Sequence, residues 1–130
     1  MISGLAGVII WSENIDRLVN FYHNILDLPI HSVRSDFVAF SFGDVRLSIG
    51  QHSGVQGFAK DPNRVMLNLA TDNIQATYEH LSERGTPFLR MPERENGGHW
   101  IATFSDPDGN ILQLLQQPIQ NEQQEMFRVS

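Results

Sequence analysis

The chain of 130 residues contains no cysteine and no run of basic residues. Without cysteine it can form no disulfide framework, zinc-thiolate site or thiol nucleophile, which fits a reducing compartment. Lysine and arginine together number 9 against 15 aspartate and glutamate residues, so the formal net charge is -6. Because no basic cluster offers a surface for phosphates, we expect no nucleic-acid partner.

Long apolar runs are also missing. The N-terminal sequence MISGLAGVIIW has no basic region, and its apolar stretch is too short for a signal peptide or a membrane span. We therefore expect a cytoplasmic protein with no membrane partner. The hydrophobic fraction of 41% is enough for one buried core, which predicts a single compact domain.

The first half of the chain has strand patterns around one helical pattern. An apolar segment rich in branched residues at 5–11 predicts a strand. Apolar residues then recur at helical spacing from Ile15 to Leu26, and Ser12 or Asn14 can cap the start of this helix. Three short strands are predicted at 28–34, 37–42 and 45–49. The predicted order is βαβββ.

The same order returns after a loop-like segment at 52–63. A strand at 65–70 precedes a helix that Thr71 or Asp72 can cap and that Gly85 ends. Strands are then predicted at 88–90, 100–104 and 111–115. Between the last two, the sequence from Asp106 to Gly109 has the residue preferences of a type I turn, which predicts an antiparallel hairpin.

Spacing supports a duplication. The sequence WSENI at 11–15 matches ATDNI at an offset of 59, whereas LSI at 47–49 matches LQL at 112–114 at an offset of 65. The second module therefore carries about six extra residues, and the polar segment 91–98 can hold them without breaking a strand. Two interpretations of this segment stay open, a lid over a pocket and a plain long hairpin loop.

These patterns predict an α+β fold of two tandem βαβββ modules. Module 1 spans about 4–51 and module 2 about 64–117, joined by the linker 52–63 within one domain, 1–117. With the helices on one side, the two sheets would form a curved, cup-like mixed sheet that has the helices on its outer face. The polar tail 118–130 is expected either to be disordered or to dock on a partner subunit.

Two segments carry a resemblance to a known family. IDRLVNFYHNILDLP resembles the helix signature of the vicinal oxygen chelate superfamily, which includes glyoxalase I, bleomycin-resistance proteins and extradiol dioxygenases, and FSDPDGNILQLLQ resembles its module-ending strand. The resemblance covers about 4–117 and implies a homodimer, but no particular activity, because one fold hosts many chemistries. Asn14 departs from the family's aspartate and Asp27 from its glycine.

The resemblance also implies where a metal would bind. Metal-bearing members hold the cation with one side chain on the first and one on the last strand of each module. The corresponding positions here are Gly7, Ser48, Met66 and Gln113. A hard divalent ion needs anionic oxygens or imidazoles, and this set supplies neither. We therefore predict no cofactor, with a divalent metal on displaced ligands as the alternative.

Strand alternation predicts which side chains line the cup. If Gln113 faces the cup, Leu112 and Leu114 cover the helix instead. The predicted ligand-binding residues are Trp11, Arg46, Ser48, Asn68, Trp100 and Gln113. Arg46 would favour a carboxylate or phosphate on the ligand, unless it is an exposed rim residue. Both tryptophans can stack on a planar ligand or pack in the core.

Three functions remain open at this stage. The first is a metal-independent protein that binds an amphipathic ligand, anionic if Arg46 faces it, similar to the drug-sequestering resistance proteins. The second is an enzyme, either a metal-free isomerase or lyase with His99 or His31 as general base, or a glyoxalase- or dioxygenase-like metalloenzyme with displaced ligands. The third is a structural or regulatory module whose cup is filled by its own side chains.

Overall fold

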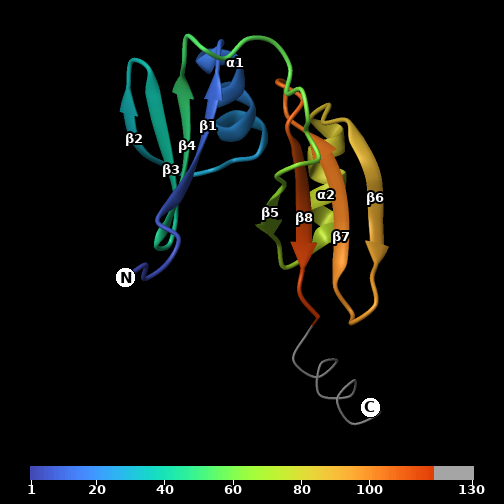
Figure 1. Cartoon of the computed structure of the whole chain (residues 1–130). Coiled ribbons are helices and arrows are strands. Elements are labelled where there is room, and N and C mark those ends of the chain that lie inside the picture. Colours follow the sequence, from blue (N-terminus) through green and yellow to red (C-terminus); the bar gives the residue numbers. More distant parts are fainter. Residues whose placement is uncertain (119–130) are drawn as a thin grey trace. The chain divides into compact units, whose positions relative to one another are not determined.

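The computed structural model describes residues 1–118 of the chain (Figure 1). The chain forms two compact units, unit 1 from Met1 to Phe58 and unit 2 beginning at Ala59. Unit 1 contains β1 (Gly7–Ser12), α1 (Ile15–Val19), η1 (Asn20–Ile25), β2 (Ile30–Arg34), β3 (Phe37–Phe42) and β4 (Val45–Gln51). Unit 2 contains β5 (Leu67–Ala70), α2 (Ile74–Glu83), β6 (Phe88–Arg94), β7 (Trp100–Ser105) and β8 (Ile111–Gln116). The predicted α+β fold with two tandem βαβββ modules is confirmed.

Each unit has one four-stranded mixed sheet, and both sheets have the same topology. The strand orders are β1-β4-β3-β2 and β5-β8-β7-β6. In each sheet the first and last strands of the module are parallel neighbours, and the other pairs are antiparallel. The helix of each unit packs on one face of its own sheet (Figure 1). We call the opposite face of each sheet its helix-distal face.

The helix of unit 1 begins as predicted and then widens. Asn14 is the N-cap, and its side-chain oxygen accepts a hydrogen bond from the Arg17 backbone N–H at 3.1 Å. After α1 the chain continues as the π-helix η1, which buries both Phe21 and Tyr22. Regular α-helical spacing predicted Tyr22, but not Phe21, on the buried face of this helix. The wider turn of a π-helix changes which side chains face the sheet, so Phe21 is buried as well. Asp27 follows with a φ of 60°, in the left-handed conformation that glycine adopts most easily and that aspartate tolerates.

The predicted caps of the second helix are wrong. The N-cap of α2 is Asn73, whose side-chain oxygen accepts a hydrogen bond from the Ala76 N–H at 3.1 Å. Thr71 lies two residues before this N-cap, where its hydroxyl accepts from the Asn73 N–H at 3.3 Å and lies 2.8 Å from the hydroxyl of Thr77. Gly85 ends the helix with a φ of 87°, as predicted. Within residues 1–118, no helix is long and apolar enough to cross a membrane.

Both modules tie the end of their last strand to the start of their helix. In unit 1, the Gln51 side-chain oxygen accepts a hydrogen bond from the Ile15 N–H at 3.1 Å. In unit 2, Gln116 does the same for the Ile74 N–H at 2.7 Å. These N–H groups lie in the first turn, where no backbone acceptor exists within the helix. The duplication thus extends to single hydrogen bonds.

The prediction of a loop at 91–98 is wrong for residues 91–94, which belong to a strand. Strand β6 continues to Arg94, and a tight turn follows, in which Glu95 N–H donates to the His99 carbonyl at 2.7 Å. The extra residues of module 2 therefore lengthen the hairpin of β6 and β7. A lid role for this hairpin stays a prediction. The pairing of β6 with β7 shifts register between Arg90 and Glu93. Pro92 is tolerated in this strand because it lies in that irregularity.

Some strand boundaries also differ from prediction. β1 starts at Gly7 and not at residue 5, β2 starts at Ile30 and not at residue 28, and β5 starts at Leu67 and not at residue 65. Met66 consequently lies just outside β5. The segment 52–63 contains no helix or strand. The predicted tail lies outside the described residues from position 119 onward.

The turn between β7 and β8 is confirmed. The Gly109 N–H donates to the Asp106 carbonyl at 3.0 Å, as a type I turn requires. One carboxylate oxygen of Asp106 also accepts from the backbone N–H groups of Asp108 and Asn110, at 2.9 and 3.0 Å. The turn fixes the register of β7 and β8, and this register sets the orientation of Gln113.

Candidate functional site

The helix-distal face of unit 2 carries a row of polar residues across all four strands. Leu112 and Leu114 are buried on the helix side of β8, so Gln113 between them faces away from the helix. Gln113 is the register partner of Asn68 on β5 and of Thr103 on β7. Thr103 is in turn the partner of Arg90 on β6. We call Asn68, Gln113, Thr103 and Arg90 the polar row.

Two members of the polar row are hydrogen-bonded to each other. The Gln113 side-chain N–H donates to the side-chain oxygen of Asn68 at 3.1 Å. Alternation along the strands predicted both residues on this face. It missed Thr103 and Arg90. The hairpin register set by the Asp106 turn could have predicted that Thr103 lies on this face. The face of Arg90 could not be predicted, because the bulge at Leu89 interrupts the alternation in β6.

Arg90 already has anionic partners. Its guanidinium donates to Glu93 at 3.0 Å and to Glu95 at 3.1 Å. The hydrogen bond to Arg90, together with its positive charge, lowers the pKa of Glu93. The same hydrogen bond raises the pKa of Arg90. Because two carboxylates neutralise the guanidinium, this end of the polar row is not an open site for an anion.

Apolar side chains flank the polar row. Ile101 on β7 and Leu115 on β8 are register partners on one side of it. Ile111 lies on the other side, opposite Ser105. A polar row between apolar rows is the usual composition of a surface that binds a small organic molecule.

The helix-distal face of unit 1 has an aromatic character instead. Trp11 on β1 and Phe37 on β3 are both register partners of Gly50 on β4. A Cβ atom at Gly50 would lie 2.4 Å from the Trp11 ring, so this ring covers the glycine. The Trp11 ring centre lies 6.1 Å from that of Phe37 and 5.3 Å from that of His52. We call Trp11, Phe37 and His52 the aromatic shelf.

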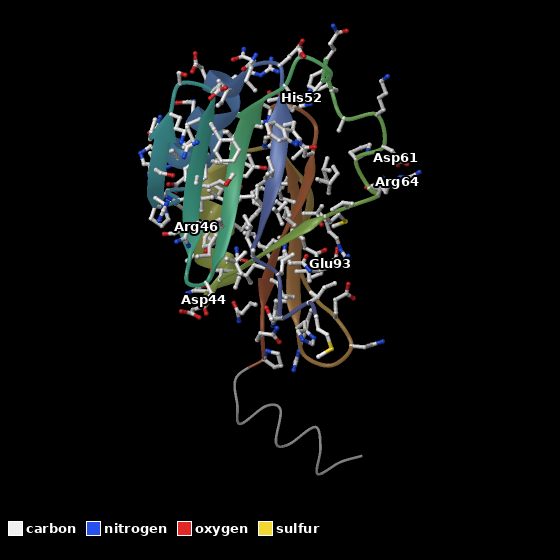
Figure 2. All side chains as sticks on the ribbon, turned by 60° about the vertical axis from the view of Figure 1, so that its left-hand side comes forward. Asp44, Arg46, His52, Asp61, Arg64 and Glu93 are labelled. Carbon is white, nitrogen blue, oxygen red and sulfur yellow. The ribbon has the colours of Figure 1, made fainter. Side chains whose placement is uncertain are left out.

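Two polar residues of unit 1, Ser48 and Arg46, precede Gly50 on β4. Ser48 is buried, at 5% exposure, between its register partners Ile9 and Ala39. Arg46 is half-buried, and its guanidinium donates to the Gly43 carbonyl at 3.2 Å. Figure 2 shows Arg46 toward the Asp44 end of β4, while His52 follows the other end.

The four family metal positions do not fit a divalent cation. At Gly7 a Cβ would lie 2.6 Å from the Arg46 carbonyl oxygen, so the backbone leaves no room for a ligand side chain. Met66 lies outside β5, and the Gln113 amide is bonded to Asn68. Neutral hydroxyl, thioether and amide groups are poor replacements for the water of a hard cation. In residues 1–118, no three His, Cys, Asp or Glu side chains gather in a metal-binding group.

The remaining predicted site residues lie apart from the polar row. Trp100 pairs with Gln116, whose side chain reaches α2, so Trp100 lies on the helix side of β7. His31 is exposed on the edge strand β2 of unit 1. His99 is half-buried beside the β6–β7 turn of unit 2. A base role for either histidine stays a prediction.

Comparison with known proteins supports the resemblance seen in the sequence. Residues 4–114 match the model of the Glyoxalase/Bleomycin resistance protein/Dioxygenase superfamily. A member of that superfamily from Sphaerobacter thermophilus has a TM-score of 0.71 and 23% identity, over 89% of this chain and 98% of that chain. A glyoxalase/bleomycin resistance protein/dioxygenase from Nocardioides has a TM-score of 0.72 and 20% identity, over 92% of this chain and 87% of that chain.

A third similar structure has an enzyme name. Lactoylglutathione lyase from Agrobacterium tumefaciens has a TM-score of 0.70 and 15% identity, over 88% of this chain and 94% of that chain. At such identities, likeness to these structures supports the fold alone. The match over residues 4–114 together with the duplicated βαβββ topology shows that this chain belongs to the glyoxalase/bleomycin resistance protein/dioxygenase superfamily.

Proposed function

We propose that this chain is a metal-independent protein that binds a small amphipathic organic molecule at the helix-distal face of the sheet of unit 1. The observation that carries the proposal is the aromatic shelf of unit 1. Trp11 keeps 40% of its surface exposed although Phe37 and His52 lie beside it. An aromatic ring held in place over a glycine offers a flat face on which a planar ligand can stack.

The chemistry at the family metal positions supports binding without a metal. Neutral groups occupy these positions, and Gly7 has no space for a side chain. A glyoxalase- or dioxygenase-like reaction uses a cation as Lewis acid, and Gly7, Ser48, Met66 and Gln113 offer no anionic or imidazole ligand for one. A cytoplasmic location and a homodimer belong to the same proposal. Light scattering coupled to size-exclusion chromatography tests the dimer.

The positive charge of Arg46 favours a ligand that carries a negative group. Arg46 and Gly50 are four residues apart on β4, which corresponds to about 13 Å along a strand. A ligand that contacts both Arg46 and the aromatic shelf is therefore elongated, with an aromatic part at one end and a carboxylate or phosphate at the other.

A thermal-shift screen with matched variants tests this function. Naphthalene-2-carboxylate and longer aryl carboxylates should raise the midpoint of unfolding of the native protein. Trp11→Ala should abolish the shift, and Gly50→Ala should reduce it by displacing the Trp11 ring. Phe58→Ala removes an aromatic side chain that is 70% exposed elsewhere in unit 1, and should leave the shift unchanged.

The Arg46 contribution needs its own comparison. Arg46→Ala should weaken the binding of the longer aryl carboxylates, which can reach both the aromatic shelf and Arg46, but not that of their neutral amides. Arg64→Ala is the matched control, because Arg64 is exposed and pairs with Asp61 at 3.0 Å (Figure 2). Shifts that persist in the correctly folded Trp11→Ala variant would contradict the role of the aromatic shelf. Equal losses in Arg46→Ala and Arg64→Ala would contradict the role of Arg46.

A further inference from the structure

The bonded amides of Asn68 and Gln113 retain hydrogen-bonding capacity. A carboxamide has two N–H donors and an oxygen with two lone pairs. The bond between the two side chains uses one N–H of Gln113 and one lone pair of Asn68. Within residues 1–118, neither the NH₂ group of Asn68 nor the oxygen of Gln113 has a hydrogen-bond partner. Both groups can therefore bind another molecule.

This leftover pair of groups does not depend on which amide is the donor. If both amides were rotated, Asn68 would donate to Gln113, and one donor and one acceptor would still remain. The two side chains project from neighbouring parallel strands in register, which fixes their spacing. Their 3.1 Å hydrogen bond holds the two amide ends together, and the free NH₂ group and the free oxygen each belong to one of these amide ends.

The charges nearby select a neutral ligand group. Arg90, at the far end of the polar row, is bonded to Glu93 and Glu95, so this cluster has one positive and two negative groups. A carboxylate on the ligand would meet net negative charge there. Leu115, which is half-buried beside Gln113 on β8, favours an apolar ring next to the hydrogen-bonding group.

We propose that Asn68 and Gln113 together bind a neutral lactam or carboxamide. Its carbonyl accepts from the Asn68 NH₂ group, and its adjacent N–H donates to the Gln113 oxygen. The inference rests on the proposed function and names the ligand chemistry recognised by unit 2. It is separate from the aromatic shelf and from Arg46, which belong to unit 1.

Side-chain amide NMR of the full chain tests this inference. The probes are 2-pyridone, which has adjacent N–H and C=O groups, and N-methyl-2-pyridone, which lacks the N–H. We expect 2-pyridone to shift the side-chain amide signals of Asn68 and Gln113, and N-methyl-2-pyridone to bind about tenfold more weakly. Gln113→Met and Asn68→Leu should each weaken 2-pyridone binding by about tenfold.

Gln75 provides a matched control for the Gln113 substitution. Gln75→Met makes the same substitution at an exposed position on α2, and should leave 2-pyridone binding unchanged. Backbone spectra of each variant establish that it is folded. Equal affinity for the two pyridones would overturn this inference while leaving binding of naphthalene-2-carboxylate at the aromatic shelf intact.

The other outcomes separate this inference from the proposed function. If neither pyridone nor naphthalene-2-carboxylate binds, both fail. If the Asn68 and Gln113 signals change with protein concentration and not with 2-pyridone, a second copy of the chain covers the pair, and the inference is overturned.

Discussion

The buried carboxylate of Asp106 organises the hairpin of β7 and β8. It accepts two backbone hydrogen bonds and one from the Asn110 side chain at 2.9 Å. Asp106→Ala would leave these donors without their acceptor in a buried turn, so the free energy of unfolding should fall by about 3 kcal/mol. Urea denaturation measures this change. Asp72→Ala, at an exposed position before α2, should change stability by less than about 0.5 kcal/mol. Similar losses in both variants would contradict the role given to Asp106.

The Arg90–Glu93 pair makes a pH-dependent prediction. The hydrogen bond from Arg90 lowers the pKa of Glu93 from its ordinary value of 4.5. A lowered folded-state pKa means that the pair stabilises the fold above pH 4.5, and that this contribution is lost as the pH falls through the folded-state pKa. Carbon-13 NMR of the Glu93 carboxyl should give a pKa below 4.5 in the native protein. In Arg90→Met the Glu93 pKa should return toward 4.5.

A neighbouring arginine provides the control for this titration. Arg94 is on the same strand but is not bonded to Glu93 in the described contacts. Arg94→Met should therefore leave the Glu93 pKa low. If Arg90→Met and Arg94→Met shift it equally, general surface charge and not the specific hydrogen bond sets the pKa.

Single residues of the site were predictable where strands are regular. Strand alternation predicted Gln113 and Asn68 on the helix-distal face, and the structure makes them register partners. Arg90 was not predictable, because a bulge at Leu89 reverses the alternation in β6. Trp100 was assigned to the ligand site, but its position in β7 turns it to the helix side.

At the scale of elements, the glutamines that end β4 and β8 support the two helices. Gln51 and Gln116 accept from the first-turn N–H groups of α1 and α2. Replacing either by leucine leaves a helix N–H without an acceptor, so each variant should lose about 1 kcal/mol of unfolding free energy. Gln75→Leu on the exposed side of α2 is the control. An undiminished stability in both Gln51→Leu and Gln116→Leu would show that water replaces these caps without cost.

The elements themselves were predicted better than their irregularities. Turn residues and periodicity predicted the eight strands and two helical segments found in residues 1–118, because these signals are local. The π-helix η1 was missed, and so was the continuation of β6 to Arg94 in the β6–β7 hairpin. Both depend on tertiary packing, since η1 buries Phe21 against the core and β6 pairs with β7 through its bulges. Spacing alone cannot show whether extra residues extend strands or form a loop.

At the scale of the whole molecule, the duplication is conserved in topology but not in the chemistry of the helix-distal faces. Ser48 and Gln113 occupy equivalent positions in β4 and β8, and Ile9 and Asn68 are equivalent in β1 and β5. Unit 1 therefore has a buried hydroxyl near an aromatic shelf, whereas unit 2 has a polar row. The sequence predicted the duplication, because the two modules share signatures at fixed offsets. The identity of the ligand depends on side-chain arrangements that those signatures do not specify.

The central claim is that the protein acts without a resident metal, because Gly7, Ser48, Met66 and Gln113 cannot hold a hard cation. Elemental analysis of protein produced in medium with added zinc, iron, manganese and nickel, and purified without chelators, tests it most directly. We predict that each metal is present at far less than one ion per chain, and that naphthalene-2-carboxylate raises the unfolding midpoint of this same preparation. One ion of any of these metals per chain, retained through purification, would contradict the account.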